Sequence, residues 1–78
     1  MNSHEREVKK MVSNRIASWR RYCGLSQKEM AKILQIGETT YRMKELGYSE
    51  FRHSEIKDFT NEVKKYDATV NEQIIFFS

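Results

Sequence analysis

Apolar residues recur every three or four positions along much of the chain, which is the spacing of one face of an α-helix. In the N-terminal part this pattern predicts a long amphipathic helix over about residues 3–22. Its apolar stripe consists of Val8, Met11, Val12, Ile16 and Trp19. Gly24 marks the end of this helix, because glycine readily adopts the left-handed conformation found just past helix C-termini.

Residues 26–46 predict two short helices joined by a turn. Ser26 and Glu29 form the S-x-x-E pattern of a capping box, so the first of these helices begins at Gln27. Its buried side is predicted to consist of Met30, Ala31 and Leu34. The turn falls at residues 35–37.

The following helix runs from about residue 38 to residue 45 or 46 and has two unlike faces. Tyr41 supplies the inward anchor and shares its side with Lys44. The outward side carries Thr39, Arg42, Met43 and Leu46. Polar or flexible side chains of this kind suit contacts with base edges and phosphates, although many polar helix faces are only solvated. Because a helix-turn-helix inserts its second helix into the major groove, the pattern predicts DNA binding.

The C-terminal third predicts two further helices. After a connection at residues 48–51, in which Phe51 is expected to fill the core, a helix begins within residues 52–54 and ends near Tyr66. Its inward residues are predicted to be Ile56, Phe59 and Val63.

Thr69 and Glu72 repeat the capping pattern and predict a last helix starting at Val70. The chain is therefore expected to be all-α, a compact five-helix bundle forming one domain over residues 1–78. Seventy-eight residues support one modest core and leave no room for a separate catalytic domain.

Cysteine content and hydropathy indicate a cytoplasmic protein without a membrane partner. No apolar run approaches the length of a membrane span or a signal peptide. Cys23 is the single cysteine and has no partner for an internal disulfide, which is typical of a reducing compartment.

The charge distribution favours an anionic partner. Residues 1–32 contain eight Lys or Arg and three Glu, a balance of +5, whereas residues 33–78 contain six basic and eight acidic residues, a balance of −2. These balances sum to the net charge of +3. Basic residues that contact phosphates make affinity fall as salt rises.

No pattern in the sequence indicates catalysis. His4 and His53 have no metal-ligand spacing with another histidine, cysteine or acidic residue. The chain has no glycine-rich phosphate loop, and Cys23 has no identifiable base. We therefore expect no enzyme activity, metal, cofactor or small-molecule ligand.

Residues 14–76 resemble the Cro and lambda-repressor (XRE-like) type of helix-turn-helix protein. The resemblance is carried in the helix-turn-helix by Gln27, Ala31 and Glu45-Leu46-Gly47, and upstream by Asn14, Arg15, Ile16, Trp19, Arg20, Gly24 and Leu25. It implies a lambda-repressor-like bundle and an ion pair between Arg20 and Glu45. The chain departs from the family pattern at Gln35, Gly37, Glu38 and Lys44, where the family usually has glycine, a Ser or Thr cap, a DNA-contacting polar residue and an apolar residue.

The resemblance also implies which residues contact DNA. The base contacts are expected from Glu38, Thr39 and Met43. The phosphate contacts are expected from Gln27, Lys28, Arg42, Lys44, Tyr48 and Arg52. The expected function is that of a transcriptional regulator, a repressor or Cro-like protein of phage or mobile-element type, bound to an operator in double-stranded DNA.

A homodimer is expected because operators of this class contain two related half-sites. The candidate dimer contacts are Ile75, Phe76, Phe77, Val8 and Met11, and packing within one chain is the alternative. Two other functions remain open from the sequence. One is an antitoxin-like or other protein-interaction module that uses its helix-turn-helix for autoregulation, and the other is a DNA-bending accessory protein.

Overall fold

The computed structural model describes residues 14–77, and all regular elements in this range are helical. Residues 14–22 form the described part of the first helix, followed by α2 (Gln27–Ile33), α3 (Glu38–Glu45), α4 (His53–Lys64) and the short π-helical segment η1 (Gln73–Phe77). The prediction of a compact all-α fold is confirmed. The N-terminal part of the expected long helix, with Val8 and Met11, lies outside the described residues.

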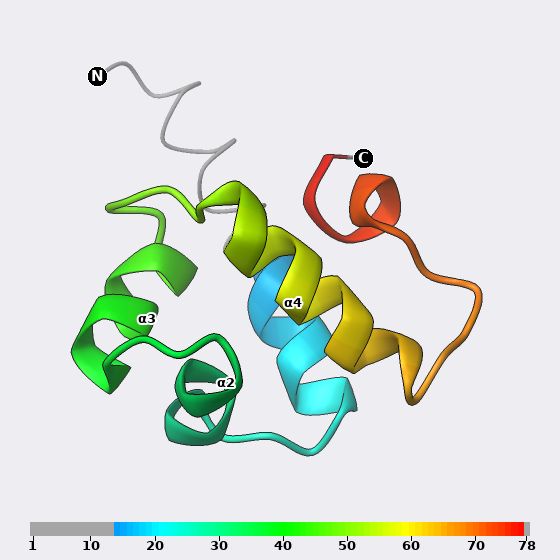
Figure 1. The fold of residues 1–78 in the computed structure, drawn as a ribbon, viewed down its shortest axis with the longest axis horizontal. Helices are drawn as coiled ribbons and strands as arrows, with labels where there is room; N and C mark the ends of the chain where they lie inside the picture. Colours follow the sequence, from blue (N-terminus) through cyan, green and yellow to red (C-terminus); the bar gives the residue numbers. More distant parts are fainter. Residues whose placement is uncertain (1–13, 78) are drawn as a thin grey trace.

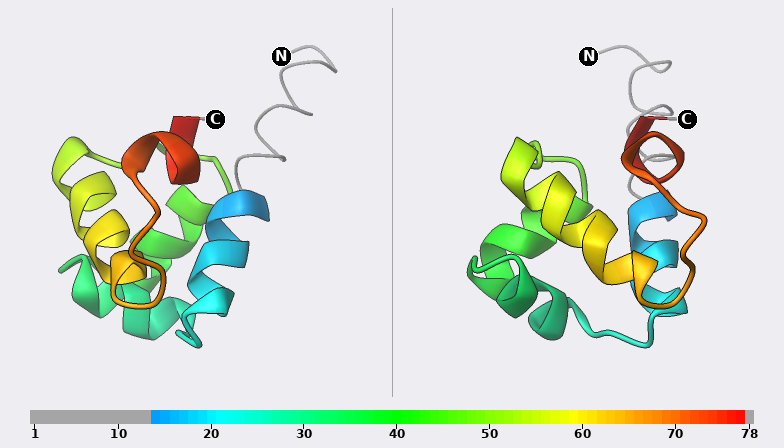
Figure 2. Two further views of the ribbon diagram at one scale, coloured as in Figure 1. Left: turned by 90° about the vertical axis from the view of Figure 1, so that its right-hand side faces the viewer. Right: turned by 45° about the vertical axis from the view of Figure 1, so that its right-hand side comes forward.

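The helices surround one core. α2 packs directly against α3, and α2 also contacts α4. The first described helix lies behind α4 in Figure 1, and η1 returns to the opposite side of the molecule from α2 and α3 (Figures 1 and 2). None of the helices within residues 14–77 is long and apolar enough to cross a membrane.

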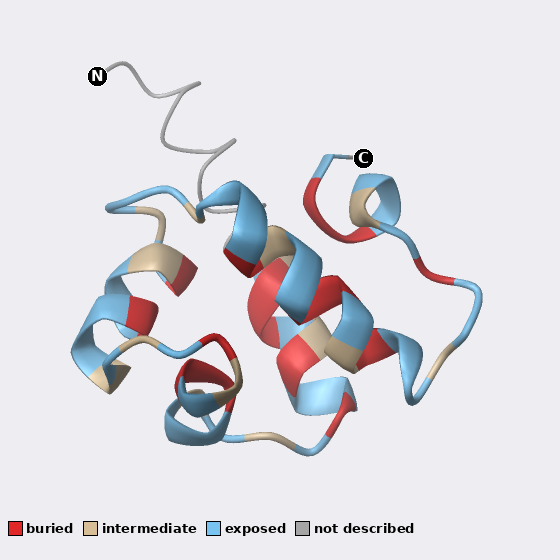
Figure 3. Ribbon diagram, in the orientation of Figure 1, coloured by how far each residue is buried: buried red, intermediate tan, exposed pale blue. Residues whose placement is uncertain are grey.

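Each of these segments contributes inward-facing apolar residues to the core (Figure 3). The largest side chains that are fully buried are those of Tyr41, Phe59, Ile16, Met30, Ile75 and Val63. The inward positions predicted for α2 are therefore confirmed, as are Tyr41 in α3 and Phe59 and Val63 in α4. Ile56 is partly buried, and Cys23 is a buried free thiol.

A cluster of aromatic rings joins α3, α4 and the C-terminal segment. Phe51, in the connection before α4, lies 6.0 Å from the ring of Tyr41, 6.4 Å from Phe59 and 5.4 Å from Phe76. Phe59 and Phe76 also form a T-shaped pair at 5.4 Å. Such edge-to-face pairs stabilise a core beyond the burial of their area alone. The predicted role of Phe51 as a core residue is thus confirmed, although its side chain is only partly buried.

The ends of α2 and α3 follow local rules with one exception. The predicted capping box is present: the Ser26 hydroxyl accepts from Glu29 N (3.0 Å), and the Glu29 carboxylate accepts from Ser26 N (2.9 Å). Gly37 is the N-cap of α3 and provides no side-chain hydrogen bond. Gln35, in the turn, has φ +61°, a left-handed conformation that costs energy for any residue except glycine.

The prediction of a last helix beginning at Val70 is wrong. The Thr69 backbone N and hydroxyl both donate to the Asp67 carboxylate instead of forming a capping box. Val70 is buried, and its N–H donates to the Asp67 carbonyl (3.4 Å) in a turn before the helix. The Asn71 side chain accepts a hydrogen bond from Ile74 N (2.9 Å) and so caps the helix that follows. A carboxylate two residues away competes for the threonine, and this local competition overrides the S/T-x-x-E pattern.

Two of the candidate dimer residues lie in the core. Ile75 is 0% exposed and Phe76 is 9% exposed, whereas Phe77 is 60% exposed. The assignment of Ile75 and Phe76 as candidate dimer contacts is therefore corrected, because the core of the same chain buries both side chains. Phe76 packs against the rings of Phe51 and Phe59, and Ile75 belongs to the same core cluster, so neither offers a surface to a second subunit.

Candidate nucleic-acid interface

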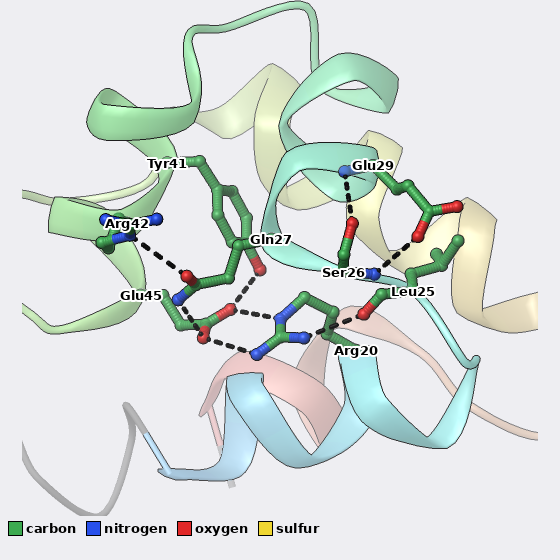
Figure 4. Close-up of polar contacts among 8 residues, drawn as sticks. All are labelled: Arg20, Leu25, Ser26, Gln27, Glu29, Tyr41, Arg42 and Glu45. Atoms are coloured by element: carbon green, nitrogen blue, oxygen red, sulfur yellow. Dashed lines mark hydrogen bonds and ion pairs between the residues drawn. The ribbon is translucent and has the colours of Figure 1, made fainter.

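A buried ion pair between the first helix and α3 holds these two helices together (Figure 4). Arg20 Nε donates to Glu45 Oε2 (2.9 Å), and Arg20 Nη2 donates to Glu45 Oε1 (3.1 Å), which makes the pair bidentate. A third nitrogen, Nη1, donates to the backbone carbonyl of Leu25 (2.8 Å). The ion pair implied by the family resemblance is therefore present.

Glu45 is the centre of a larger network. Besides Arg20, the Tyr41 hydroxyl and Gln27 Nε2 (3.1 Å) donate to its carboxylate. Burial by itself would raise the pKa of Glu45, but these hydrogen bonds outweigh burial and lower it. The hydrogen bond to Glu45 raises the pKa of Arg20, and burial raises that of Tyr41, so the network holds an ionised pair and a neutral phenol.

The network extends from Glu45 to the protein surface through Gln27. The Gln27 amide nitrogen donates to Glu45, and its oxygen accepts from Arg42 Nε (3.1 Å). Arg42 Nη2 in turn donates to Glu38 Oε2 (2.7 Å), one helical turn earlier in α3. An amide is suited to this position because its nitrogen can donate to a carboxylate while its oxygen accepts from a guanidinium. The conformation of Arg42 is thereby linked to the core.

The exposed side of α3 brings together most of the predicted DNA contacts. Thr39 is exposed and Met43 is 42% exposed, while the Glu38 and Arg42 side chains are 40% and 52% exposed. Gln27 reaches the same surface from the start of α2, next to the exposed Lys28. These residues form what we call the α3 face: Gln27, Lys28, Glu38, Thr39, Arg42 and Met43.

Lys44 does not belong to this face. Its side chain is 8% exposed and forms an ion pair with Glu55, whose carboxylate also accepts from Arg52 N (2.7 Å) at the start of α4. Burial opposes ionisation of Glu55, yet the hydrogen bonds from Lys44 and Arg52 lower its pKa. The prediction of a phosphate contact from Lys44 is therefore corrected, because its ammonium group is committed to joining α3 to α4.

Sequence reasoning placed Lys44 correctly on the inward side of α3 but did not find its partner. Glu55 lies eleven residues away in another helix, and no local pattern connects the two. The one signal in the sequence was the position of Lys44 beside Tyr41, since a charged residue on an inward face needs a buried partner.

The end of α3 exposes further apolar surface. Tyr48 N donates to the Met43 carbonyl (3.0 Å) and Gly47 N to the Lys44 carbonyl (3.1 Å), with Gly47 at φ +87°. This is the Schellman arrangement, in which the residues at its two ends commonly touch. Leu46 is 55% exposed and Tyr48 76% exposed, so large apolar side chains are also exposed at the C-terminal end of α3. Tyr48 and Arg52 are exposed, as their predicted phosphate roles require. Leu46 is also exposed, although it is not among the predicted contacts.

The described residues contain no group of three or more His, Cys, Asp or Glu side chains that could hold a metal ion. No protein-family model, curated protein or solved structure matches the chain.

Proposed function

We propose that the chain binds double-stranded DNA in a sequence-specific manner, with α3 in the major groove, and regulates transcription as a repressor or Cro-like protein. The observation that carries this proposal is the division of α3 between two surfaces. Tyr41 and Glu45 are buried and held by hydrogen bonds, while Thr39, Arg42 and Met43 project from the other side of the same eight-residue helix.

The chemistry of the α3 face matches what the major groove presents. Thr39 has a hydroxyl for base edges and a methyl for the thymine methyl, and Met43 adds a flexible apolar contact. The N-terminus of α2 carries Gln27 and Lys28, where the helix dipole favours a phosphate. Rigid attachment of α3 to the core supports readout, because base contacts require a fixed approach to the groove.

Selection of bound sequences from a random duplex pool tests this proposal. We expect a recurrent sequence, and we expect Thr39→Ala or Met43→Ala to change which base pairs are preferred, at about 1–3 kcal/mol per discriminated pair. Lys28→Ala is the matched control: it should weaken all duplexes alike and reduce the salt slope by about 1. Unchanged sequence preference in both α3 variants would exclude this docking mode.

We further propose that the protein acts as a homodimer on two half-sites, since one short recognition helix reads only a few base pairs. Of the three C-terminal candidates only Phe77 is exposed, and Val8 and Met11 lie outside the described residues. Sedimentation of the wild type should show a dimer that Phe77→Ser weakens and Tyr66→Ser, at another exposed aromatic residue, leaves intact. A palindromic selected sequence would support the same symmetry.

A second candidate function is a protein-interaction module of the antitoxin type. Exposed Phe77 borders a groove between α4 and the C-terminal segment that is also lined by Lys57, Asn61, Lys64 and Gln73. A partner protein bound in this groove would lose affinity for the Phe77→Ser variant while DNA binding through α3 stayed unchanged. DNA binding that requires no partner favours the first candidate.

A further inference from the structure

The Glu38–Arg42 pair has a geometry that distinguishes it from an ordinary surface ion pair. The two residues lie one turn apart on α3, with Arg42 Nη2 2.7 Å from Glu38 Oε2. Arg42 Nε is occupied by Gln27, which is itself held by buried Glu45. Hydrogen bonds to Gln27, and through it to Glu45, therefore restrict the conformation of Arg42. An ordinary surface ion pair lacks this support and loses side-chain entropy when it forms.

The donor inventory shows what the pair can still bind. A guanidinium has five N–H groups, and within residues 14–77 Arg42 uses one to Gln27 and one to Glu38. The remaining donors are both hydrogens of Nη1 and one of Nη2, so the outer edge of the guanidinium remains open for a bidentate contact. The Glu38 carboxylate, next to it, has free acceptor capacity. The pair therefore presents two donors followed by an acceptor.

A G·C base pair presents the complementary order in the major groove. Guanine offers N7 and O6 as acceptors, and cytosine then offers an N4 hydrogen as a donor. Guanine O6 and cytosine N4 are hydrogen-bonded to each other, at about 2.7–3.2 Å. This spacing matches the 2.7 Å between Arg42 Nη2 and Glu38 Oε2, so both contacts can form side by side.

Charge argues for a base edge and against a phosphate as the partner of this pair. Glu38 neutralises Arg42 locally, and a phosphate next to both groups would be repelled by the carboxylate. A base edge carries no net charge and satisfies both members. Resting on the proposed function, we propose that Glu38 and Arg42 act together as the reader of one G·C pair, with Arg42 over guanine and Glu38 over cytosine. Arg42 is then a specificity-determining residue and not a general phosphate contact.

The test combines side-chain variants with single-atom changes in the DNA. In the selected duplex, Arg42→Ala and Glu38→Ala should each lower discrimination of G·C over A·T at one and the same base pair by about fivefold or more, and leave the other positions unchanged. Lys28→Ala should lower affinity for every duplex equally. Neither α3 position is buried, and circular dichroism would verify that the variants remain folded.

Modified bases assign each half of the contact. Replacing the guanine by 7-deazaguanine, which lacks N7, should weaken the wild type about fivefold or more and leave Arg42→Ala unaffected. N4-methylcytosine opposite it should weaken the wild type and leave Glu38→Ala unaffected.

The outcomes separate the two proposals. Specific binding in which Arg42→Ala weakens all duplexes alike, or in which the two variants alter different base pairs, would overturn the composite reader and leave DNA recognition by α3 standing. Binding of the wild type to no duplex above the non-specific level would overturn both.

Discussion

At the scale of single residues, two buried ion pairs connect α3 to the helices around it. Arg20–Glu45 joins the first helix to α3, and Lys44–Glu55 joins α3 to α4, so two adjacent residues at the end of α3 are paired with two different helices. Buried pairs of this kind add little net stability compared with apolar residues, but removal of one partner is costly. Their contribution is to fix the position of α3, on which the proposed DNA contacts depend.

Replacement of Arg20 should unfold the protein at lower denaturant. Arg20→Met leaves the Glu45 carboxylate buried without its cation, and we expect a loss of about 3–5 kcal/mol in the free energy of unfolding measured in urea. Arg21→Met is the matched control, since Arg21 is exposed, and should change stability by less than about 0.5 kcal/mol. An Arg20→Met midpoint equal to that of the wild type would contradict this role.

Acid should destabilise the fold through the same carboxylates. The pKa values of Glu45 and Glu55 are lowered in the folded state, so their contribution is complete above the ordinary carboxyl pKa of 4.5 and is lost as pH falls through the lower folded value. We expect the free energy of unfolding to decrease below about pH 4.5. Glu45→Gln should make the unfolding free energy depend less steeply on pH in this range. A pH dependence equal to that of the wild type would show that the pKa of Glu45 does not change on folding.

At the scale of elements, the turn between α2 and α3 carries a local strain that the sequence does not relieve. Gln35 holds a left-handed backbone at φ +61°, and α3 begins at a glycine cap without a side-chain hydrogen bond. The Ile36 N–H nevertheless donates to the Ala31 carbonyl (3.0 Å), and Tyr41 is fully buried on the far side of the turn. Packing of Ile36 and Tyr41 therefore stabilises a turn geometry that Gln35 alone disfavours.

Relief of this strain should stabilise the protein. Gln35→Gly removes the steric penalty of the left-handed conformation, and we expect a gain of about 1 kcal/mol in the free energy of unfolding. Gln35→Val, with a β-branched side chain at the same φ, should lose stability. The thermal midpoints of the two variants should lie on either side of the wild-type value, and a Gln35→Gly midpoint below it would show that the glutamine side chain makes a contribution larger than the strain.

At the scale of the whole molecule, the C-terminal segment closes the core. Val70, Ile75 and Phe76 are buried, and Phe76 contacts the rings of Phe51 and Phe59. These contacts join α4 to the C-terminal segment. The last residues are thus part of the fold, and the α3 face lies on different elements from the segment in which Phe77 is exposed.

Two adjacent phenylalanines provide a matched comparison for this conclusion. Phe76→Ala should cost about 3–5 kcal/mol in unfolding free energy because it leaves a cavity among aromatic rings. Phe77→Ala, at a residue 60% exposed, should cost less than about 1 kcal/mol in a monomeric preparation. Equal losses in the two variants, measured by urea denaturation at low protein concentration, would contradict the assigned burial.

The sequence by itself determined the elements whose causes are local. Periodicity placed α2, α3 and α4, the Ser26–Glu29 pattern set the start of α2, and the inward position of Tyr41 followed from the helical repeat. The Arg20–Glu45 pair came from family resemblance and not from spacing, since 25 residues separate its partners. These features succeed because hydrogen bonds within a turn and helical geometry depend on residues fewer than five positions apart.

Only the tertiary structure decided the rest. The Lys44–Glu55 pair, the burial of Ile75 and Phe76, and the link from Glu45 through Gln27 to Arg42 each depend on how separate helices meet. A helix repeat shows which side of an element is apolar, but the partner of a polar side chain depends on distances between elements. For this reason the sequence indicated that α3 has an exposed polar face, and the structure showed that Glu38 and Arg42 on that face form a single hydrogen-bonded unit.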